Sequence, residues 1–167
     1  MGNNTFVNSP REDIAHASMP RIDEELKSRF ESEQQKAMLN VLFTANWFKS
    51  RQVELFKPYG ISPQQYNILR ILRGAKERVN MHCVKERMID RSPNATRLTD
   101  KLIAKGLVER ERCEEDRRVV YVRISKKGLE LLSTIDKKNK LAQQQDIERL
   151  SEPDAAALNR ALDAWRG

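Results

Sequence analysis

One stretch of the chain, residues 92–125, most constrains what the whole can fold into. Ser92 and Pro93 form a typical helix start, because serine caps free N–H groups and proline suits the first helical turn. The helix is expected over residues 94–105, and Gly106 suits the left-handed position that ends it. Two strand-like runs then flank a polar turn, as in a β-hairpin. These runs are residues 107–112 and 119–124.

The residues before this stretch predict two more short elements and another helix. Ser62 and Pro63 repeat the helix start, and Gly74 is expected to end that helix. A very short strand is expected at residues 79–81, followed by a short helix over 82–89. Two short helices with a tight connection, followed by a hairpin, describe a winged helix-turn-helix. In that arrangement the second helix enters the major groove of DNA.

Long helical patterns flank this central region. Apolar residues at steps of three and four predict one helix from Ile22 to just before Pro58. Another helix is expected after Ser125, and a last one after the capping box that begins at Ser151. The apolar positions of these two helices are Leu129, Leu132 and Ile135 in the first, and Leu158, Leu162 and Trp165 in the second. The first of these helices, which begins at Ile22, is longer than a single small domain needs, and this favours packing against a second subunit.

The predicted fold class is therefore mainly α with a small β-hairpin, built as a winged helix-turn-helix domain between dimerisation helices. We expect a flexible arm at residues 1–20 and an N-terminal dimerisation helix at 21–57. The DNA-binding domain is expected at residues 61–125, and the C-terminal dimerisation helices at 126–167.

Composition narrows the class of partner. The chain of 167 residues has 31 Lys and Arg against 24 Asp and Glu, a net charge of +7, which favours polyanionic partners.

No stretch approaches the roughly 20 apolar residues of a membrane span. Cys83 and Cys113 are too few for a disulfide framework or a zinc site. We therefore predict a reduced, cytoplasmic protein with no cofactor, no metal site and no membrane partner. No catalytic cluster or phosphate-binding glycine loop is present, so an enzyme is the least favoured class.

The helix over residues 94–105 has two different faces at 100° per residue. Ala95, Leu98 and Leu102 share one side and are expected in the core, whereas Arg97, Asp100 and Lys101 lie mainly on the other. Arg97 is suited to guanine, and Asn94 to adenine. Thr96 suits a thymine methyl group or a phosphate, and Lys101 suits a phosphate. An ordinary amphipathic helix with a solvated charged face shows the same pattern.

The hairpin turn carries Asp116, Arg117 and Arg118 where hairpins usually have glycine or asparagine. An arginine at a projecting tip suits a narrow minor groove, where the negative potential is enhanced. Asp116 suits a pairing role that orients one guanidinium. A solvated charged turn is the alternative.

Several runs of residues resemble the MarR family of bacterial transcription regulators. They are residues 69–72, 94–102, 105–110, 116–118 and 122–128. The resemblance implies a homodimer with intertwined terminal helices that binds double-stranded DNA at a pseudo-palindromic operator. It also implies that Arg118 enters the minor groove with Asp116 as its partner. The recognition-helix positions would be Ser92, Asn94, Thr96, Arg97 and Lys101. Arg91 and Pro93 depart from the family's usual lead into this helix, so base preferences do not carry over.

The leading hypothesis is a dimeric, sequence-specific repressor that a small-molecule effector releases from DNA. The candidate effector-binding residues are Trp47, Phe48, Phe56 and Tyr66, although each of them also suits plain core packing. Two alternatives stay open. One is a winged-helix module that binds proteins and not DNA, and the other is a thiol-based redox-responsive regulator that uses Cys83 or Cys113.

Overall fold

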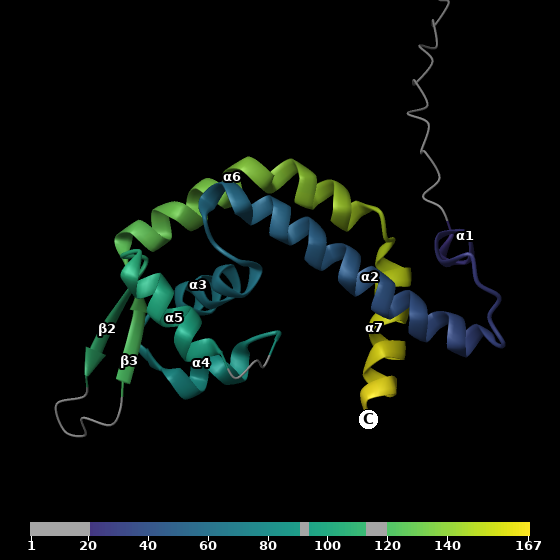
Figure 1. The fold of residues 1–167 in the computed structure, drawn as a ribbon, viewed down its shortest axis with the longest axis horizontal. Coiled ribbons are helices and arrows are strands. Elements are labelled where there is room, and N and C mark those ends of the chain that lie inside the picture. The colour runs from purple at the N-terminus through teal and green to yellow at the C-terminus, as the bar shows by residue number, and fades with distance from the viewer. Residues whose placement is uncertain (1–20, 91–93, 113–119) are drawn as a thin grey trace, which may run out of the picture. The chain divides into compact units, whose positions relative to one another are not determined.

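The computed structural model describes residues 21–90, 94–112 and 120–167 (Figure 1). The predicted arm at 1–20, Ser92, Cys113 and the turn residues Asp116, Arg117 and Arg118 lie outside the described residues. The chain divides into two compact units, Met1–Lys49 and Ser50–Gly167.

The described residues are mainly helical, with three short strands, as the predicted fold class requires. The helices are α1 (Ile22–Leu26), α2 (Glu33–Phe56), α3 (Pro63–Ala75), α4 (Met81–Arg87), α5 (Ala95–Ala104), α6 (Lys126–Glu148) and α7 (Glu152–Arg166), with a 3₁₀ turn η1 (Lys57–Tyr59) after α2. The strands are β1 (Val79–Asn80), β2 (Val108–Arg112) and β3 (Val120–Ile124).

The predicted hairpin is confirmed, and a third strand extends it. The strands form one antiparallel sheet in the order β1-β3-β2, so β3 lies in the middle. Val122 on β3 is opposite Val79 on one side and Arg110 on the other. The very short strand before α4 was predicted, but its pairing with β3 was not. Met81, predicted in that strand, is instead the first residue of α4.

Helix α3 lies at the centre of the second unit and contacts α4, α5, α6 and β3. Its start is as predicted: the Ser62 hydroxyl accepts a hydrogen bond from the Gln65 N–H at 3.2 Å, and the Gln65 side chain accepts one from the Ser62 N–H at 3.0 Å. The core around α3 draws on every neighbouring element. Its fully buried large side chains include Ile68, Leu69, Leu72, Val84, Leu102, Val108, Val122, Leu132 and Ile135. Each buried side chain of this size contributes about 1.5–3 kcal/mol of hydrophobic stabilisation.

The single long helix predicted from Ile22 to just before Pro58 is wrong, because the helix breaks between α1 and α2. Lys27 takes a left-handed conformation with φ of 47° and ends α1. The Ser32 hydroxyl then caps the Gln35 N–H at 3.1 Å, and the Gln35 side chain accepts from the Glu31 N–H at 2.7 Å. These local side-chain bonds offer the backbone an alternative to the helix. Apolar periodicity continues across the break and does not reveal it.

Two helix boundaries also differ from the prediction. Helix α3 continues past Gly74 to Ala75, and Lys76 rather than the glycine takes the left-handed position, with φ of 60°. Leu72 is fully buried and Arg73 pairs with Asp136 on α6, so tertiary contacts hold the last turn of α3. Helix α5 begins at Ala95, one residue later than expected, with Asn94 at the N-cap position. Gly106 does take the predicted left-handed conformation after α5, with φ of 69°.

The C-terminal helices expose much of their apolar side. Leu132 and Ile135 of α6 are fully buried, but Leu141 and Ile147 farther along the same helix are exposed. Ser151 is the N-cap residue of α7, as predicted, and its hydroxyl accepts from the Asp154 N–H at 3.3 Å. No helix among the described residues is both long and apolar enough to cross a lipid bilayer.

Candidate nucleic-acid interface

The buried face of α5 attaches this helix to the core. Ala95, Thr99 and Leu102 are fully buried, and Leu98 is half-buried. Thr99 was not among the predicted core residues. Its hydroxyl donates to the carbonyl of Ala95 at 2.9 Å, so it satisfies its polar group within its own helix. The position, four residues after Ala95 and three before Leu102, is the signal that places it on the inner face.

The opposite face of α5 is exposed, and it carries the residues that sequence analysis assigned to DNA. Thr96, Arg97 and Lys101 are exposed, as is Asn94 just before the helix. Within the described residues, Arg97 and Lys101 form no ion pair. Two cations therefore lie on the solvent side of a helix whose other side is fixed in the core.

A tight connection joins α5 to the sheet. The Gly106 N–H donates to the Ile103 carbonyl at 2.8 Å, and the Leu107 N–H donates to the Leu102 carbonyl at 3.0 Å. This is the Schellman arrangement, in which a left-handed residue satisfies the last carbonyls of a helix. Leu107 and Val108 are buried immediately after it, so β2 starts in a fixed position relative to α5.

Ion pairs brace both faces of the sheet. Arg123 on β3 pairs with Glu109 on β2 at 2.7 Å, and these residues are direct cross-strand partners. Arg78 pairs with Glu111 on β2 and lies 4.8 Å from the ring centre of Tyr121 on the middle strand. On the side that faces α5, Arg110 pairs with Asp100. The role of Arg110 was not predicted, because its partner Asp100 lies on a different element.

Helix α4 precedes α5, and an N-cap and core contacts fix its position. The Asn80 side chain accepts from the Cys83 N–H at 2.9 Å, and Val84 and Met88 are buried. Cys83 is half-buried, and His82 is exposed beside Glu86, with 3.1 Å between Nε2 and the carboxylate oxygen. Nowhere in the described residues do three His, Cys, Asp or Glu side chains gather as metal ligands would.

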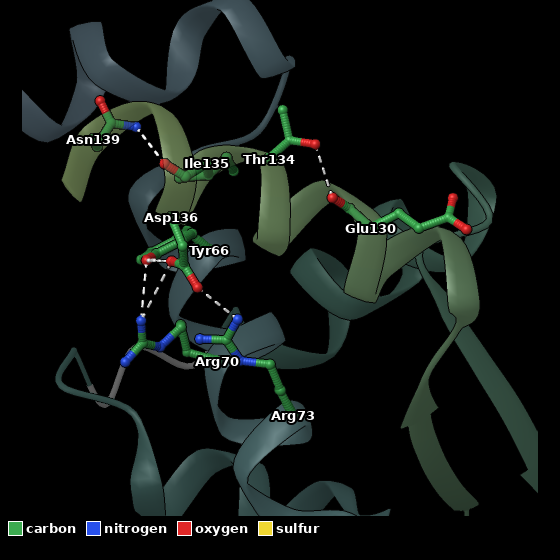
Figure 2. Close-up of polar contacts among 8 residues, drawn as sticks. All are labelled: Tyr66, Arg70, Arg73, Glu130, Thr134, Ile135, Asp136 and Asn139. Atoms are coloured by element: carbon green, nitrogen blue, oxygen red, sulfur yellow. Dashed lines mark hydrogen bonds and ion pairs between the residues drawn. The ribbon is translucent and has the colours of Figure 1, made fainter.

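A polar cluster joins α3 to α6 (Figure 2). The Asp136 carboxylate on α6 pairs with Arg73 at 2.7 Å and with Arg70 at 3.7 Å, both on α3. The Tyr66 hydroxyl lies 3.4 Å from the same carboxylate and also accepts from Arg70 at 3.4 Å. One acid thus gathers three side chains of α3 at the edge of the core.

The four candidate effector-binding residues form two aromatic contacts. Phe56 is buried and stacks on Tyr66, with ring centres 4.2 Å apart. Trp47 and Phe48 meet edge to face at 4.9 Å within α2, and Phe48 is exposed. Tyr66 is therefore both a stacking partner of Phe56 and a member of the cluster around Asp136.

Comparison with known proteins identifies this arrangement. The family model described as MarR matches residues 61–120. A MarR transcription factor from Planctomyces limnophilus is 33% identical to the chain, covering 81% of this chain and 99% of that one with a TM-score of 0.62. The chain belongs to the MarR family. The resemblance drawn from the sequence motifs is thereby confirmed, and the family is one of transcription regulators.

More distant MarR structures share the fold. A mutant MarR from E. coli, solved in complex with operator DNA, is 24% identical over 77% of this chain and 92% of that one, with a TM-score of 0.65. A putative MarR-like regulator from Bacillus cereus is 19% identical over 80% of this chain and 96% of that one, with a TM-score of 0.69. Among curated proteins, no match was found.

Proposed function

We propose that this MarR-family chain is a sequence-specific transcription regulator that binds double-stranded DNA through the exposed face of α5. The observation that carries the proposal is that Arg97 and Lys101 face solvent while the other side of α5 is fixed in the core. The complex of an E. coli MarR with operator DNA supports it, since that protein has the same fold. Arg97, Asn94 and Thr96 would contact base edges, and Lys101 a phosphate. Ser92, which is outside the described residues, would also contact DNA.

Fluorescence anisotropy with labelled duplexes from the region upstream of the coding sequence tests this proposal. We expect a specific complex that weakens steeply as salt is raised, because phosphate contacts release counterions. Replacing Arg97 and Lys101 together by glutamine should abolish the preference for the operator. Lys137 and Lys138 on α6, replaced in the same way, form a control with an equal loss of charge. Absence of any salt-sensitive specific complex would overturn the proposal.

The hairpin turn is proposed as the second DNA contact. Arg118 would enter the minor groove, Asp116 would orient it, and Arg117 would contact the backbone. An Arg118→Ala variant should bind the operator less tightly while keeping its circular dichroism spectrum and its oligomeric state. Unchanged affinity would remove the minor-groove role.

The functional unit is proposed to be a homodimer on a pseudo-palindromic operator, with α2, α6 and α7 as its dimerisation helices. Exposed apolar side chains on all three helices support this, since large exposed apolar patches mark interaction sites. They include Met38, Leu42, Phe48 and Val53 on α2, Leu141 and Ile147 on α6, and Leu158 and Trp165 on α7. Sedimentation equilibrium should give a dimer for the wild-type chain and a monomer for a Leu158→Glu variant. A monomeric wild type would contradict the proposal.

We also propose that the protein represses transcription and that a small molecule bound near the aromatic pairs releases it. The chain has two tryptophans, so a Trp165→Phe variant leaves Trp47 as the only tryptophan reporter. Compounds that change this fluorescence should also lower operator affinity, and the compounds that bind most tightly should lower it most. A reporter gene behind the operator should be expressed more strongly when the protein is absent. Compounds that bind without affecting the DNA complex would refute the release mechanism.

A further inference from the structure

An acid lies on the face of α5 that is proposed to meet DNA. Asp100 is exposed and follows Arg97 by three positions, which makes the two side chains neighbours on the helix surface. Lys101 is the next residue along the chain. An unpaired carboxylate at this position would repel phosphates and would also attract the Arg97 guanidinium away from them.

Asp100 is instead paired with a side chain from outside its own helix. Its carboxylate contacts the guanidinium of Arg110 on β2. Arg110 is opposite the buried Val122 in the strand register, and it lies two residues after the buried Val108. Since side chains two apart in a strand share a face, Arg110 projects from the side of the sheet that packs on α5.

The stability that this pair provides is small. The Asp100 and Arg110 side chains are 50% and 40% exposed, and ion pairs with that much solvent contact contribute little to folding. Its position is more informative than its energy. Among the described residues, the acid of this face contacts a strand arginine, and the helix cations Arg97 and Lys101 keep no acidic partner.

We propose that Arg110 sequesters Asp100 and so keeps Arg97 and Lys101 available to DNA. Arg110 is then a positioning residue: it acts on DNA affinity through Asp100 rather than by contacting DNA. The inference rests on the proposed function, because it assigns a role within the same interface. If this is so, removing the carboxylate of Asp100 must compensate for removing the guanidinium of Arg110.

A double-mutant cycle on the 167-residue chain tests this expectation. The variants are Arg110→Gln, Asp100→Asn and the double replacement, and the readout is anisotropy with the operator duplex and with a scrambled duplex. Arg110→Gln should weaken operator binding about tenfold, comparable to losing one arginine contact. Asp100→Asn alone should bind as tightly as the wild type or more tightly. The double variant should return to within twofold of Asp100→Asn.

A matched control comes from the other face of the same sheet. Arg123→Gln removes an equal charge and breaks the pair with Glu109. Arg123 follows Val122, the register partner of Arg110, so its side chain lies on the face of the sheet opposite Arg110. The Arg123→Gln variant should change operator affinity less than twofold. Thermal melts of every variant verify that folding is intact.

The outcomes distinguish a failure of the proposed DNA binding from a failure of the proposed role of Arg110. A wild type without salt-sensitive operator binding defeats the proposed function and the inference with it. A wild type that binds, with an Arg110→Gln variant that binds equally well, defeats the inference alone. So does a loss in Arg110→Gln that Asp100→Asn fails to rescue, because Arg110 would then contact DNA directly or serve the fold. Rescue by removal of the acid is the result that a merely structural role would not give.

Discussion

Helix α5 holds Ala95, Thr99 and Leu102 out of reach of solvent, whereas α7, described along its whole length, has no buried residue. Both helices are amphipathic, and both alternate apolar and charged positions at helical spacing. On α7, Leu158 is 46% exposed and Trp165 is 54% exposed. The region around α5 therefore completes its core within one chain, whereas α7 leaves its apolar side exposed.

The largest expected effect breaks the completed core. Leu102→Ala removes a fully buried side chain from the inner face of α5 and leaves a cavity. We expect it to lower the free energy of unfolding by about 3 kcal/mol, within the range for buried leucines. Urea denaturation followed by circular dichroism measures the loss.

The same replacement in α7 is the control. Leu158→Ala removes the same atoms from an exposed position, so its direct cost should be about 0.5 kcal/mol or less. Any larger loss should depend on protein concentration, because it would act through the proposed dimer. Equal, concentration-independent losses in the two variants would show that the contrast between α5 and α7 is wrong.

The second effect tests how closely the chain packs where α6 leaves the sheet. A Cβ added at Gly128 would overlap the carbonyl oxygen of Leu107 and press on the Ile124 side chain. Because backbone cannot move aside cheaply, Gly128→Ala should cost about 2 kcal/mol. Differential scanning calorimetry should show a lower melting temperature.

Gly74 provides a control of opposite sign. It lies within α3 and a Cβ there meets nothing within 4 Å. Gly74→Ala should therefore stabilise the protein by about 0.5–1 kcal/mol, because alanine loses less backbone entropy in a helix. A destabilised Gly74→Ala variant would contradict the open space at that position.

Local chemistry explains which parts of this fold could be predicted. Ser62 and Ser151 start their helices as expected, and Gly106 ends α5, because each effect depends on residues within a few positions. The break at Lys27 was missed because apolar periodicity continued through a segment whose own side chains compete with the helix.

Partners distant in sequence were harder to predict. The pairing of β1 with β3 joins residues about 40 positions apart, and the sequence of a two-residue strand does not specify its neighbour. For the candidate interface, the exposed positions Thr96, Arg97 and Lys101 followed from helical spacing. The pairing of Asp100 with Arg110 could not be predicted in this way. An arginine in a strand gives the same alternating sequence pattern whether its side chain faces solvent or contacts a helix.

The third effect compares two helix caps with similar geometry. Ser62 and Ser151 accept from backbone N–H groups at 3.2 and 3.3 Å. Ser62→Ala should cost about 1 kcal/mol of global stability, since α3 lies at the centre of the core. Ser151→Ala should mainly increase fraying of α7, seen as faster amide exchange there with little change in the global transition. A global loss in Ser151→Ala as large as that in Ser62→Ala would mean that α7 unfolds together with the core.

The smallest effect concerns the end of α3, where Lys76 has a φ of 60°. A left-handed conformation costs a residue with a Cβ roughly 1–2 kcal/mol, and glycine avoids that cost but loses more entropy on folding. The net gain for Lys76→Gly should therefore be about 0.5 kcal/mol. Lys76→Ala keeps the Cβ and removes the same charge, so it should gain nothing. Urea denaturation of both variants measures the difference, and equal stability of the two would mean that the end of α3 is not held in the left-handed conformation. In that case, the contacts that extend α3 beyond Gly74, such as the pair of Arg73 with Asp136, would be too weak to keep Lys76 in a strained backbone conformation.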